Sequence, residues 1–279
     1  MKTTHYLFII IIFSSLLFAC SDFGYYSQSI NGHLSIMSRR QPIANLLTDP
    51  DLPQQLKIDL QLVLNVRKFA EAILYIPVND SFMTYAELDR PYAVWNVVAA
   101  PAYSLAAYEW CFPVAGCLPY RGYFEQSAAE RFADSLQARG LDAYVYGVPA
   151  YSTLGWFDDS VLSSFIDYPD WALAGLIFHE LAHQMVYAES DGDFNEAFAS
   201  AVEQEGVRRW LLAHRNEDER AIYQQHKIRE DKFYALISST RQELLSCYDG
   251  RNNSSLKQRQ ICKESAFGAM KNHYADLKK

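Results

Sequence analysis

The sequence predicts an α+β fold that is mostly helical. Apolar residues recur at the three- and four-residue spacing of amphipathic helices on both flanks of the chain, before residue 75 and after residue 170. Runs rich in β-branched and aromatic residues lie between residues 92 and 147. The chain has 279 residues, of which 50% are hydrophobic, and this is enough to bury a large core in one compact unit.

Residues 1–19 read as a signal peptide and not as part of the fold. The apolar run from Leu7 to Phe18 is too short to span a membrane. It leads into Leu-Phe-Ala-Cys20, which resembles the lipobox of bacterial lipoproteins, although Phe18 is bulkier than the residue usual there. Cleavage before Cys20 would leave a thiol that carries lipid, and Ser21 favours the outer membrane. We expect a lipid anchor in the bacterial cell envelope, on the periplasmic face of the outer membrane; an ordinary secretory signal is the alternative.

Residues 20–90 predict an N-terminal helical segment. Apolar residues at helical spacing cover Tyr25–Ser38 and Leu56–Leu74, and two X-Pro steps near residues 50 and 53 separate these stretches. We expect the two helices to form a pair that packs against residues 91–206.

Residues 91–206 predict a small mixed sheet followed by the most apolar helix of the chain. β-rich runs occur at Tyr92–Val98, near Leu118–Phe124 and at Leu141–Gly147, and a helix is expected at Ser127–Arg139. These runs predict a sheet of three to five strands.

Residues 207–279 predict C-terminal helices. Apolar residues alternate with Glu, Arg and Gln at helical spacing, and Asp249-Gly250 begins a clear turn. We expect a helical hairpin that covers the core.

A metal-binding pattern lies in the apolar helix, where His179, Glu180 and His183 spell H-E-x-x-H. Histidines four residues apart share one helix face, so both imidazoles can hold one metal ion. Glu180 lies about 100° around the helix from His179, where it can accept a proton from a water activated by the metal without being a ligand. The alternative is an amphipathic helix with two polar histidines at the edge of a core, but burying three such side chains is costly unless something pairs them.

The third ligand is expected after the motif. Glu196 follows thirteen residues after His183, beyond a polar turn, and Asp193 is a natural N-cap for the helix that carries it. Glu189 is the alternative, but Val186 stands where the metzincin arrangement needs a glycine. Two imidazoles, one carboxylate and an open position are typical of catalytic zinc. We therefore expect one Zn²⁺ on the two histidines and Glu196.

The pattern His179-Glu180-x-x-His183 with Asn195-Glu196 resembles the gluzincin metallopeptidases, the group that includes thermolysin. Three stretches resemble, more narrowly, a family of bacterial lipoproteins described as zinc aminopeptidases: Cys111–Phe124, Gly147–Asp159 and the metal stretch itself. The resemblance extends from about residue 25 to residue 209. It implies a zincin-like catalytic core at residues 91–206 and a zinc-dependent peptidase of the aminopeptidase type. It also implies His179, His183 and Glu196 as ligands and Glu180 as general base.

The chain departs from the gluzincin pattern in two ways. Only twelve residues separate His183 from Glu196, fewer than in thermolysin-like enzymes, and Ser200 stands where those enzymes carry an aspartate that orients a ligand. Glu203, two helical turns after Glu196, is our candidate for that orienting role. Asn195 is the second candidate for support of the ligands.

The stretch before the metal helix is a candidate for substrate binding. Tyr151–Gly155 could form an edge strand that pairs with a peptide, with Gly155 allowing the peptide backbone to approach closely. An ordinary surface loop is the alternative. The pair Asp158-Asp159 either caps the following helix or binds the positive N-terminus of a substrate.

A hydrogen-bond donor for the developing oxyanion is also expected. Tyr151 is our first choice for this role. Arg121 is a candidate for oxyanion or substrate binding, and Tyr120, Tyr123 and Tyr187 remain open as alternatives because the chain has 19 tyrosines.

The net charge limits the classes of binding partner, and the cysteine content indicates possible disulfides. The formal net charge is −8 and no basic run occurs, which argues against nucleic acid. A peptide substrate and a membrane reached through the N-terminal lipid are the expected partners. Apart from Cys20, four cysteines remain, and they permit three disulfide pairings in an oxidising compartment. Proximity in the sequence favours Cys111–Cys117 and Cys247–Cys262, with free buried thiols as the alternative.

Two other classes of function stay open at this point. In the first, a zinc-containing protein of the envelope binds or assembles other molecules without catalysis. In the second, an interaction lipoprotein binds no metal. Metal content and the effect of Glu180→Gln distinguish these two classes from a peptidase.

Overall fold

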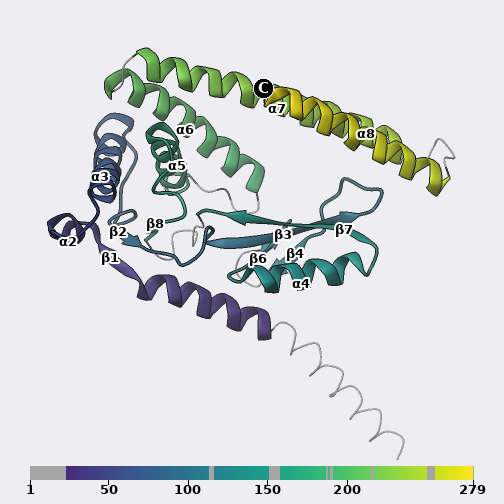
Figure 1. The fold of residues 1–279 in the computed structure, drawn as a ribbon, viewed down its shortest axis with the longest axis horizontal. Coiled ribbons are helices and arrows are strands. Elements are labelled where there is room, and N and C mark those ends of the chain that lie inside the picture. The colour runs from purple at the N-terminus through teal and green to yellow at the C-terminus, as the bar shows by residue number, and fades with distance from the viewer. Residues whose placement is uncertain are drawn as a thin grey trace, which may run out of the picture.

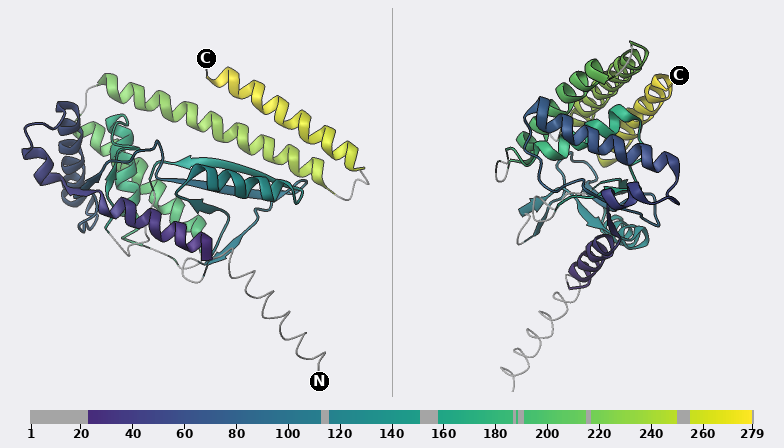
Figure 2. Two further views of the ribbon diagram at one scale, coloured as in Figure 1. Left: turned by 60° about the horizontal axis from the view of Figure 1, so that its bottom comes forward. Right: turned by 90° about the vertical axis from the view of Figure 1, so that its left-hand side faces the viewer.

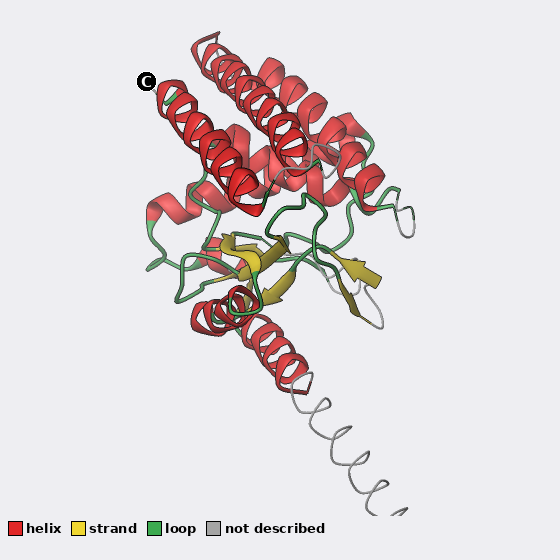
Figure 3. Cartoon of the chain, turned by 90° about the vertical axis from the view of Figure 1, so that its right-hand side faces the viewer, coloured by secondary structure: helices red, strands yellow, loops and turns green. Residues whose placement is uncertain are grey.

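The structure is a computed structural model that describes residues 23–112, 116–150, 158–186, 188, 191–214, 217–249 and 255–278. These residues form mostly helices with small sheets, so the predicted α+β class is confirmed (Figure 1). Seen from the side, the strands lie between the long C-terminal helices and a shorter helical layer below them (Figure 3). Among the described residues, no helix combines the length and the apolar character needed to cross a membrane.

The two N-terminal helices pack against different partners. The helix at residues 23–38 places the ring of Tyr25 5.5 Å from that of Tyr123, a residue of the central sheet. Helix α3 (Gln54–Leu74) instead packs against helix α5 (Asp170–Ala182), with Phe69 and Phe178 in ring contact at 6.1 Å. Ile36 of the first helix nevertheless shares the larger hydrophobic cluster with α3, and the pairing of the two helices stays a prediction. A short helix, α2 (Ile43–Thr48), connects them through buried Ile43 and Leu46.

The first sheet is small and was not predicted. Its order is β1 (Arg40–Pro42), β2 (Thr84–Ala86) and β8 (Val161–Leu162), with β1 antiparallel and β8 parallel to β2. These strands have three, three and two residues, too few to show a period of two in the sequence. The parallel pair joins two segments that lie 76 residues apart, since Tyr85 pairs with Val161.

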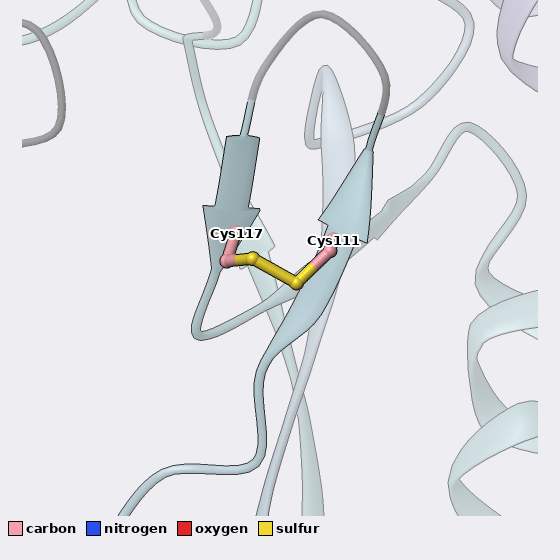
Figure 4. The surroundings of a disulfide bond; sticks show 2 residues. All are labelled: Cys111 and Cys117. Carbon is pink, nitrogen blue, oxygen red and sulfur yellow. A yellow bond between two sulfur atoms is a disulfide. The ribbon is translucent and has the colours of Figure 1, made fainter.

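The second sheet contains the runs that the sequence predicted. Strand β3 (Val94–Pro101) lies between β6 (Arg121–Tyr123) and β7 (Leu141–Val148), antiparallel to both, and α4 (Gln126–Gln137) packs on the sheet. A separate hairpin, β4 (Trp110–Phe112) and β5 (Gly116–Leu118), carries the Cys111–Cys117 disulfide across its two strands (Figure 4). The expected single sheet is thus divided into two, because the run near residues 118–124 is shared between β5 and β6.

Two hydrophobic clusters correspond to these two parts. The larger joins α2, α3, the first sheet, α5 and α6 (Gly192–His214). The smaller lies between the second sheet and α4, around Trp95, Val97 and Leu136. The β3 strand begins in the larger cluster at Val94 and continues into the smaller one at Trp95.

Helices α5 (Asp170–Ala182) and α6 (Gly192–His214) approach each other closely. A Cβ atom at Gly206 would lie 2.6 Å from Cδ2 of Phe178, so only glycine fits there without displacing that ring. The sequence predicted a boundary between residues 91–206 and the C-terminal helices directly after Gly206. The structure has one continuous helix, because packing against α5 outweighs the low helix propensity of glycine.

Helices α7 (Glu217–Tyr248) and α8 (Leu256–Leu277) form the predicted C-terminal hairpin along one side of the molecule (Figures 1 and 2). The Cys247–Cys262 disulfide joins the end of α7 to the start of α8. Ser255 caps α8 through a reciprocal capping box with Gln258. Both disulfides are those that proximity in the sequence favours.

Candidate metal centre

Helix α5 carries the H-E-x-x-H motif at its C-terminal end. Most of its side chains are buried between α3, α6 and the first sheet, among them Leu173, Ile177, Phe178 and Leu181. His179 lies in the last turn and His183 is the C-cap residue, still in helical conformation. Their rings are 5.0 Å apart between centroids, so the helix presents both imidazoles on one face.

The start of α6 brings the third group back toward α5. Asp191 caps this helix, because its side chain accepts a hydrogen bond of 3.0 Å from the N–H of Phe194. Asp193, the cap expected from the sequence, lies one residue inside the helix, where its carboxylate still complements the helix dipole. Glu196 follows one turn later and has an exposed side chain.

Asn195 supports this turn and is buried at 4% exposure. Its Oδ1 accepts a hydrogen bond of 2.8 Å from the N–H of Ala188, and its Nδ2 donates one of 2.9 Å to the carbonyl of the same residue. Asn195 therefore fixes the chain between the two helices. The sequence had suggested that it supports the ligands, and the described contacts place its action on the connecting backbone.

The two histidines and Glu196 converge on one point. Nε2 of His179 lies 3.3 Å from Oε2 of Glu196, and Nε2 of His183 lies 3.6 Å from Oε1 of the same carboxylate. One ligand atom from each residue lies within 4.8 Å of the others. In a tetrahedral zinc site, bonds of about 2.0–2.2 Å place neighbouring ligand atoms roughly 3.4 Å apart. The donor types and their spacing fit Zn²⁺.

Glu203 contacts the other side of His179. Its Oε2 lies 3.1 Å from Nδ1 of the imidazole, so a proton on Nδ1 leaves the lone pair of Nε2 pointing toward Glu196. Gly175 makes room for this carboxylate, because a Cβ there would lie 3.2 Å from Oε1 of Glu203. The structure thus brings Glu203 to the position that the sequence argument gave it.

The two imidazoles differ in their electrostatics. Burial lowers the pKa of His179, but the hydrogen bond to Glu203 and the surrounding carboxylates outweigh it, so this pKa is raised. For His183, burial dominates and the pKa is lowered. A neutral imidazole is the ligand form, and the carboxylate on Nδ1 sets which nitrogen of His179 is available.

Glu180, the residue after His179, lines a small hollow. The hollow is lined also by Asp159, Phe82 and Phe165. Burial raises the pKa of Glu180 to about 7; the charge of His179 opposes this, and the charges of Asp159, Glu196 and Glu203 add to it. A carboxyl group that titrates near neutral pH can both accept and return a proton.

Several other residues singled out by the sequence lie elsewhere. The guanidinium of Arg121 lies 3.9 Å from the ring centroid of Tyr25 and 4.9 Å from that of Phe132, inside the aromatic cluster of the second sheet. Tyr123 belongs to the same cluster, where burial raises its pKa to about 12. Five further candidates lie outside the described residues: Cys20, Tyr151, Gly155, Tyr187 and Glu189.

Sequence reasoning missed Ser81 and Phe82. Ser81 is fully buried, and its Oγ accepts hydrogen bonds from the N–H of Asp159 at 3.1 Å and from Nε2 of Gln184 at 3.3 Å. The N–H of Phe82 donates to the carbonyl of Asp159 at 2.6 Å. These contacts join segments 78 residues apart, and neither periodicity nor a motif predicts such a pairing.

Comparison with known proteins gives one match. No curated protein and no solved structure matches the chain. A family model described as "Putative aminopeptidase" matches residues 24–279, which is nearly all of the chain and includes the metal-binding pattern. This match supports peptidase activity as the general class of function. The protein therefore belongs to the family described as "Putative aminopeptidase".

Proposed function

We propose that this chain is a zinc-dependent aminopeptidase in which His179, His183 and Glu196 hold the metal and Glu180 is the general base. The observation that carries the proposal is the convergence of three ligand atoms from α5 and α6 within 4.8 Å, with Glu180 on the same helix turn as His179. Membership of the aminopeptidase family supports the same class of reaction.

Zn²⁺ bound by these three groups supplies Lewis-acid polarisation of the scissile carbonyl and of the attacking water. Glu180 accepts the proton of that water and passes it to the leaving amine. Its pKa of about 7 suits both transfers near neutral pH. Partial burial of Glu180 also limits the exchange of that proton with bulk solvent.

The remaining residues hold this arrangement in place. Glu203 accepts the Nδ1 proton of His179 and so fixes the tautomer and orientation of that ring. Asn195 ties the α5–α6 connection to the first turn of α6, and this keeps Glu196 directed toward the histidines. The exposed side chain of Glu196 leaves one side of the site open to a peptide.

A lipid anchor on Cys20 is part of the proposal. It rests on the signal sequence alone and would tether the enzyme to the periplasmic face of the outer membrane. Metabolic labelling with a radioactive fatty acid tests it. Label that is present in the wild-type chain and lost in Cys20→Ser supports the anchor, and an unlabelled wild type contradicts it.

The test of function compares the zinc-loaded chain with two variants, Glu180→Gln and the control Glu205→Gln on the exposed side of α6. Each is mixed with peptides that have free or acetylated N-termini, and the products are read by mass spectrometry. We expect residues to be removed one by one from free N-termini. Glu180→Gln is expected to lose about 10²- to 10⁴-fold of the rate while binding one zinc, and Glu205→Gln is expected to match the wild type.

Other outcomes identify other functions. Internal cuts in both peptide pools, lost in Glu180→Gln, would keep the zinc mechanism but make the protein an endopeptidase. Zinc bound at one ion per chain without any cleavage would favour a non-catalytic zinc protein. A folded chain that takes up no zinc would overturn the proposal.

A further inference from the structure

An apolar stripe runs along the outer side of the helix at residues 23–38. Its members are Phe23, Tyr26, Ile30, Leu34 and Met37. At 100° per residue they fall within an arc of about 80°, and no polar residue of this helix lies in that arc. Phe23 is 76% exposed, Ile30 59% and Leu34 56%. Single exposed apolar side chains are ordinary on a protein surface, but a continuous stripe of them marks an interaction surface.

The opposite face of the helix packs on the protein and fixes the rotation of the helix about its axis. Oε1 of Gln28 accepts a hydrogen bond of 3.1 Å from the N–H of Phe124. A Cβ atom at Gly32 would collide with the ring of Phe124, so the helix backbone lies directly against that ring. Ile36 is 2% exposed and belongs to the larger hydrophobic cluster. These contacts hold the stripe facing away from the rest of the protein.

The stripe and its helix carry no fixed charge. Residues 23–38 contain no lysine, arginine, aspartate or glutamate. Entry of this helix into an apolar phase therefore requires no desolvation of an ionised side chain, which is the costly step for other surface helices. In α8, by contrast, the exposed side chains of Leu256 and Ile261 lie on the same helix as Lys257 and Arg259. The stripe is thus suited to an apolar phase and not to a charged partner.

The place of the helix in the chain indicates which apolar phase this is. Cys20, the proposed site of lipid attachment, precedes Phe23 by three residues, and an extended chain of that length spans at most roughly 11 Å. A lipid on Cys20 therefore holds the start of the helix at the membrane surface. Helices that lie in this region bury their apolar faces about 5–10 Å into the boundary between headgroups and acyl chains. Aromatic side chains such as those of Phe23 and Tyr26 at the anchored end suit this interface.

We propose that the helix at residues 23–38 lies in the surface of the phospholipid bilayer that holds the Cys20 lipid, with its apolar stripe inserted between the lipids. This inference rests on the lipid anchor of the proposed function and adds an orientation to it. The anchor supplies a high local concentration, so a stripe of five side chains is sufficient for insertion. The helix and the α7–α8 hairpin lie on opposite sides of the sheets (Figures 1 and 3), so the hairpin faces away from the membrane.

The test is photo-crosslinking in vesicles of phosphatidylethanolamine and phosphatidylglycerol. The chain from Cys20 onward is coupled through the thiol of Cys20 to a maleimide-bearing phosphatidylethanolamine; the other four cysteines form two disulfides. A diazirine-bearing amino acid replaces Leu34 in one sample and Ile261 of α8 in the control. After illumination, mass spectrometry is expected to find lipid adducts at position 34 and none at position 261.

Other products would overturn the inference. Crosslinked protein dimers at position 34, in place of lipid adducts, would identify a second copy of this chain as the partner. Absence of adducts at position 34, or equal yields at both positions, would show that the stripe does not enter the bilayer. The chemical coupling replaces lipidation by the cell, so these outcomes are distinct from failure of the fatty-acid labelling, which overturns the natural anchor.

A matched pair of variants tests whether the stripe itself is responsible. With the diazirine at position 34, Ile30→Gln is expected to lower the yield of lipid adducts by about tenfold, because it removes one apolar side chain from the inserted face. Ile261→Gln changes an isoleucine of similar exposure, 56% against 59%, and is expected to leave the yield unchanged. Circular dichroism establishes that both variants are folded. Equal yields in the two variants would contradict insertion of the stripe.

Discussion

Two helix pairs, α5–α6 and α7–α8, are held together by different means. The first pair approaches closely at Gly175 and Gly206, and it buries Phe178 and Trp210 against α3. The second pair is joined by the Cys247–Cys262 disulfide, and only five of its side chains, among the described residues, are buried: Tyr223, Thr240, Leu244, Cys247 and Ala266. Large apolar side chains such as Ile222 and Tyr234 remain exposed on α7.

The α5–α6 pair positions the side chains of the candidate site, whereas the α7–α8 pair covers one side of the molecule. The α5–α6 pair brings polar groups of both helices to one point, so small changes in its packing displace the proposed metal ligands His179, His183 and Glu196. The α7–α8 pair carries none of the described ligand or hollow-lining residues, and a covalent bond replaces much of the packing that would otherwise hold it. We therefore expect changes in the two pairs to affect stability and metal binding independently.

The largest expected effect is loss of the C-terminal disulfide. The bond closes a loop with a sequence separation of 15 residues, and a loop of this length is expected to contribute about 3 kcal/mol to the free energy of unfolding. The double variant Cys247→Ser/Cys262→Ser should lose that stability in urea titrations while its zinc affinity stays unchanged. A parallel fall in zinc affinity would show that the two helix pairs are coupled, and the comparison would fail.

The second effect comes from two helical glycines with opposite surroundings. Gly206 lies in α6 against Phe178, whereas a Cβ on Gly268 in α8 would meet nothing within 4 Å. Gly206→Ala is expected to lower the free energy of unfolding by about 2 kcal/mol through overpacking. Gly268→Ala is expected to raise it by about 0.5–1 kcal/mol, because alanine is the better helix former. Chemical denaturation of both variants checks the signs, and equal signs would show that close packing does not distinguish the pairs.

A third prediction concerns the polar contacts across α5–α6. Glu203→Ala removes the acceptor for Nδ1 of His179 and is expected to weaken zinc binding by about 10- to 100-fold. Glu205→Ala is the control, since Glu205 lies on the same helix but pairs with Arg208 and Arg209 in solvent. Competition with a zinc chelator measures both affinities. If Glu203→Ala and Glu205→Ala bind zinc equally well, Glu203 does not position the ligand.

The smallest expected effect is on the pH dependence of stability, and it comes from exposed charged side chains on α6. Hydrogen bonds from Arg208 and Arg209 lower the pKa of Glu205 to about 2. Because this folded-state pKa lies below the unfolded value of about 4.3, the cluster stabilises the fold above that value and its contribution is lost as the pH falls toward 2. The stability difference between wild type and Glu205→Gln should therefore shrink between pH 5 and pH 2. The difference is expected to be small because solvent and salt screen the exposed charges.

The sequence predicted the elements that are long and periodic. Helices α3, α4, α7 and α8 and strands β3 and β7 lie within a few residues of their expected positions, because burial on one face leaves a repeating pattern. It failed at β1, β2 and β8, whose two or three residues carry no pattern and whose pairing depends on distant segments. The predicted boundary after Gly206 was also wrong, because α6 continues through it, packed against Phe178.

In the candidate site, too, contacts between residues close in the sequence could be predicted, and contacts between distant segments could not. His179, Glu180 and His183 are local to one helix, and the turn that returns Glu196 is short, so their convergence could be predicted. The assignment of the α6 cap to Asp193 was wrong, because Asp191 is of the same residue type and only the side-chain geometry selects it. The contact between Ser81 and Asp159 is non-local and polar, and a single sequence contains no signal for it.

The second sheet has a further consequence for how this architecture can vary. Val94 and Val148 are cross-strand partners, so the chain leaves the larger cluster and rejoins it at adjacent points. Between them, residues 94–148 enclose most of the smaller hydrophobic cluster. Strands β2 and β8, which precede and follow residues 94–148 in the chain, pair directly with each other. A segment with neighbouring ends can be shortened, lengthened or exchanged between homologues while the register of its attachment points is kept, so related chains should differ in length here more readily than between α5 and α6.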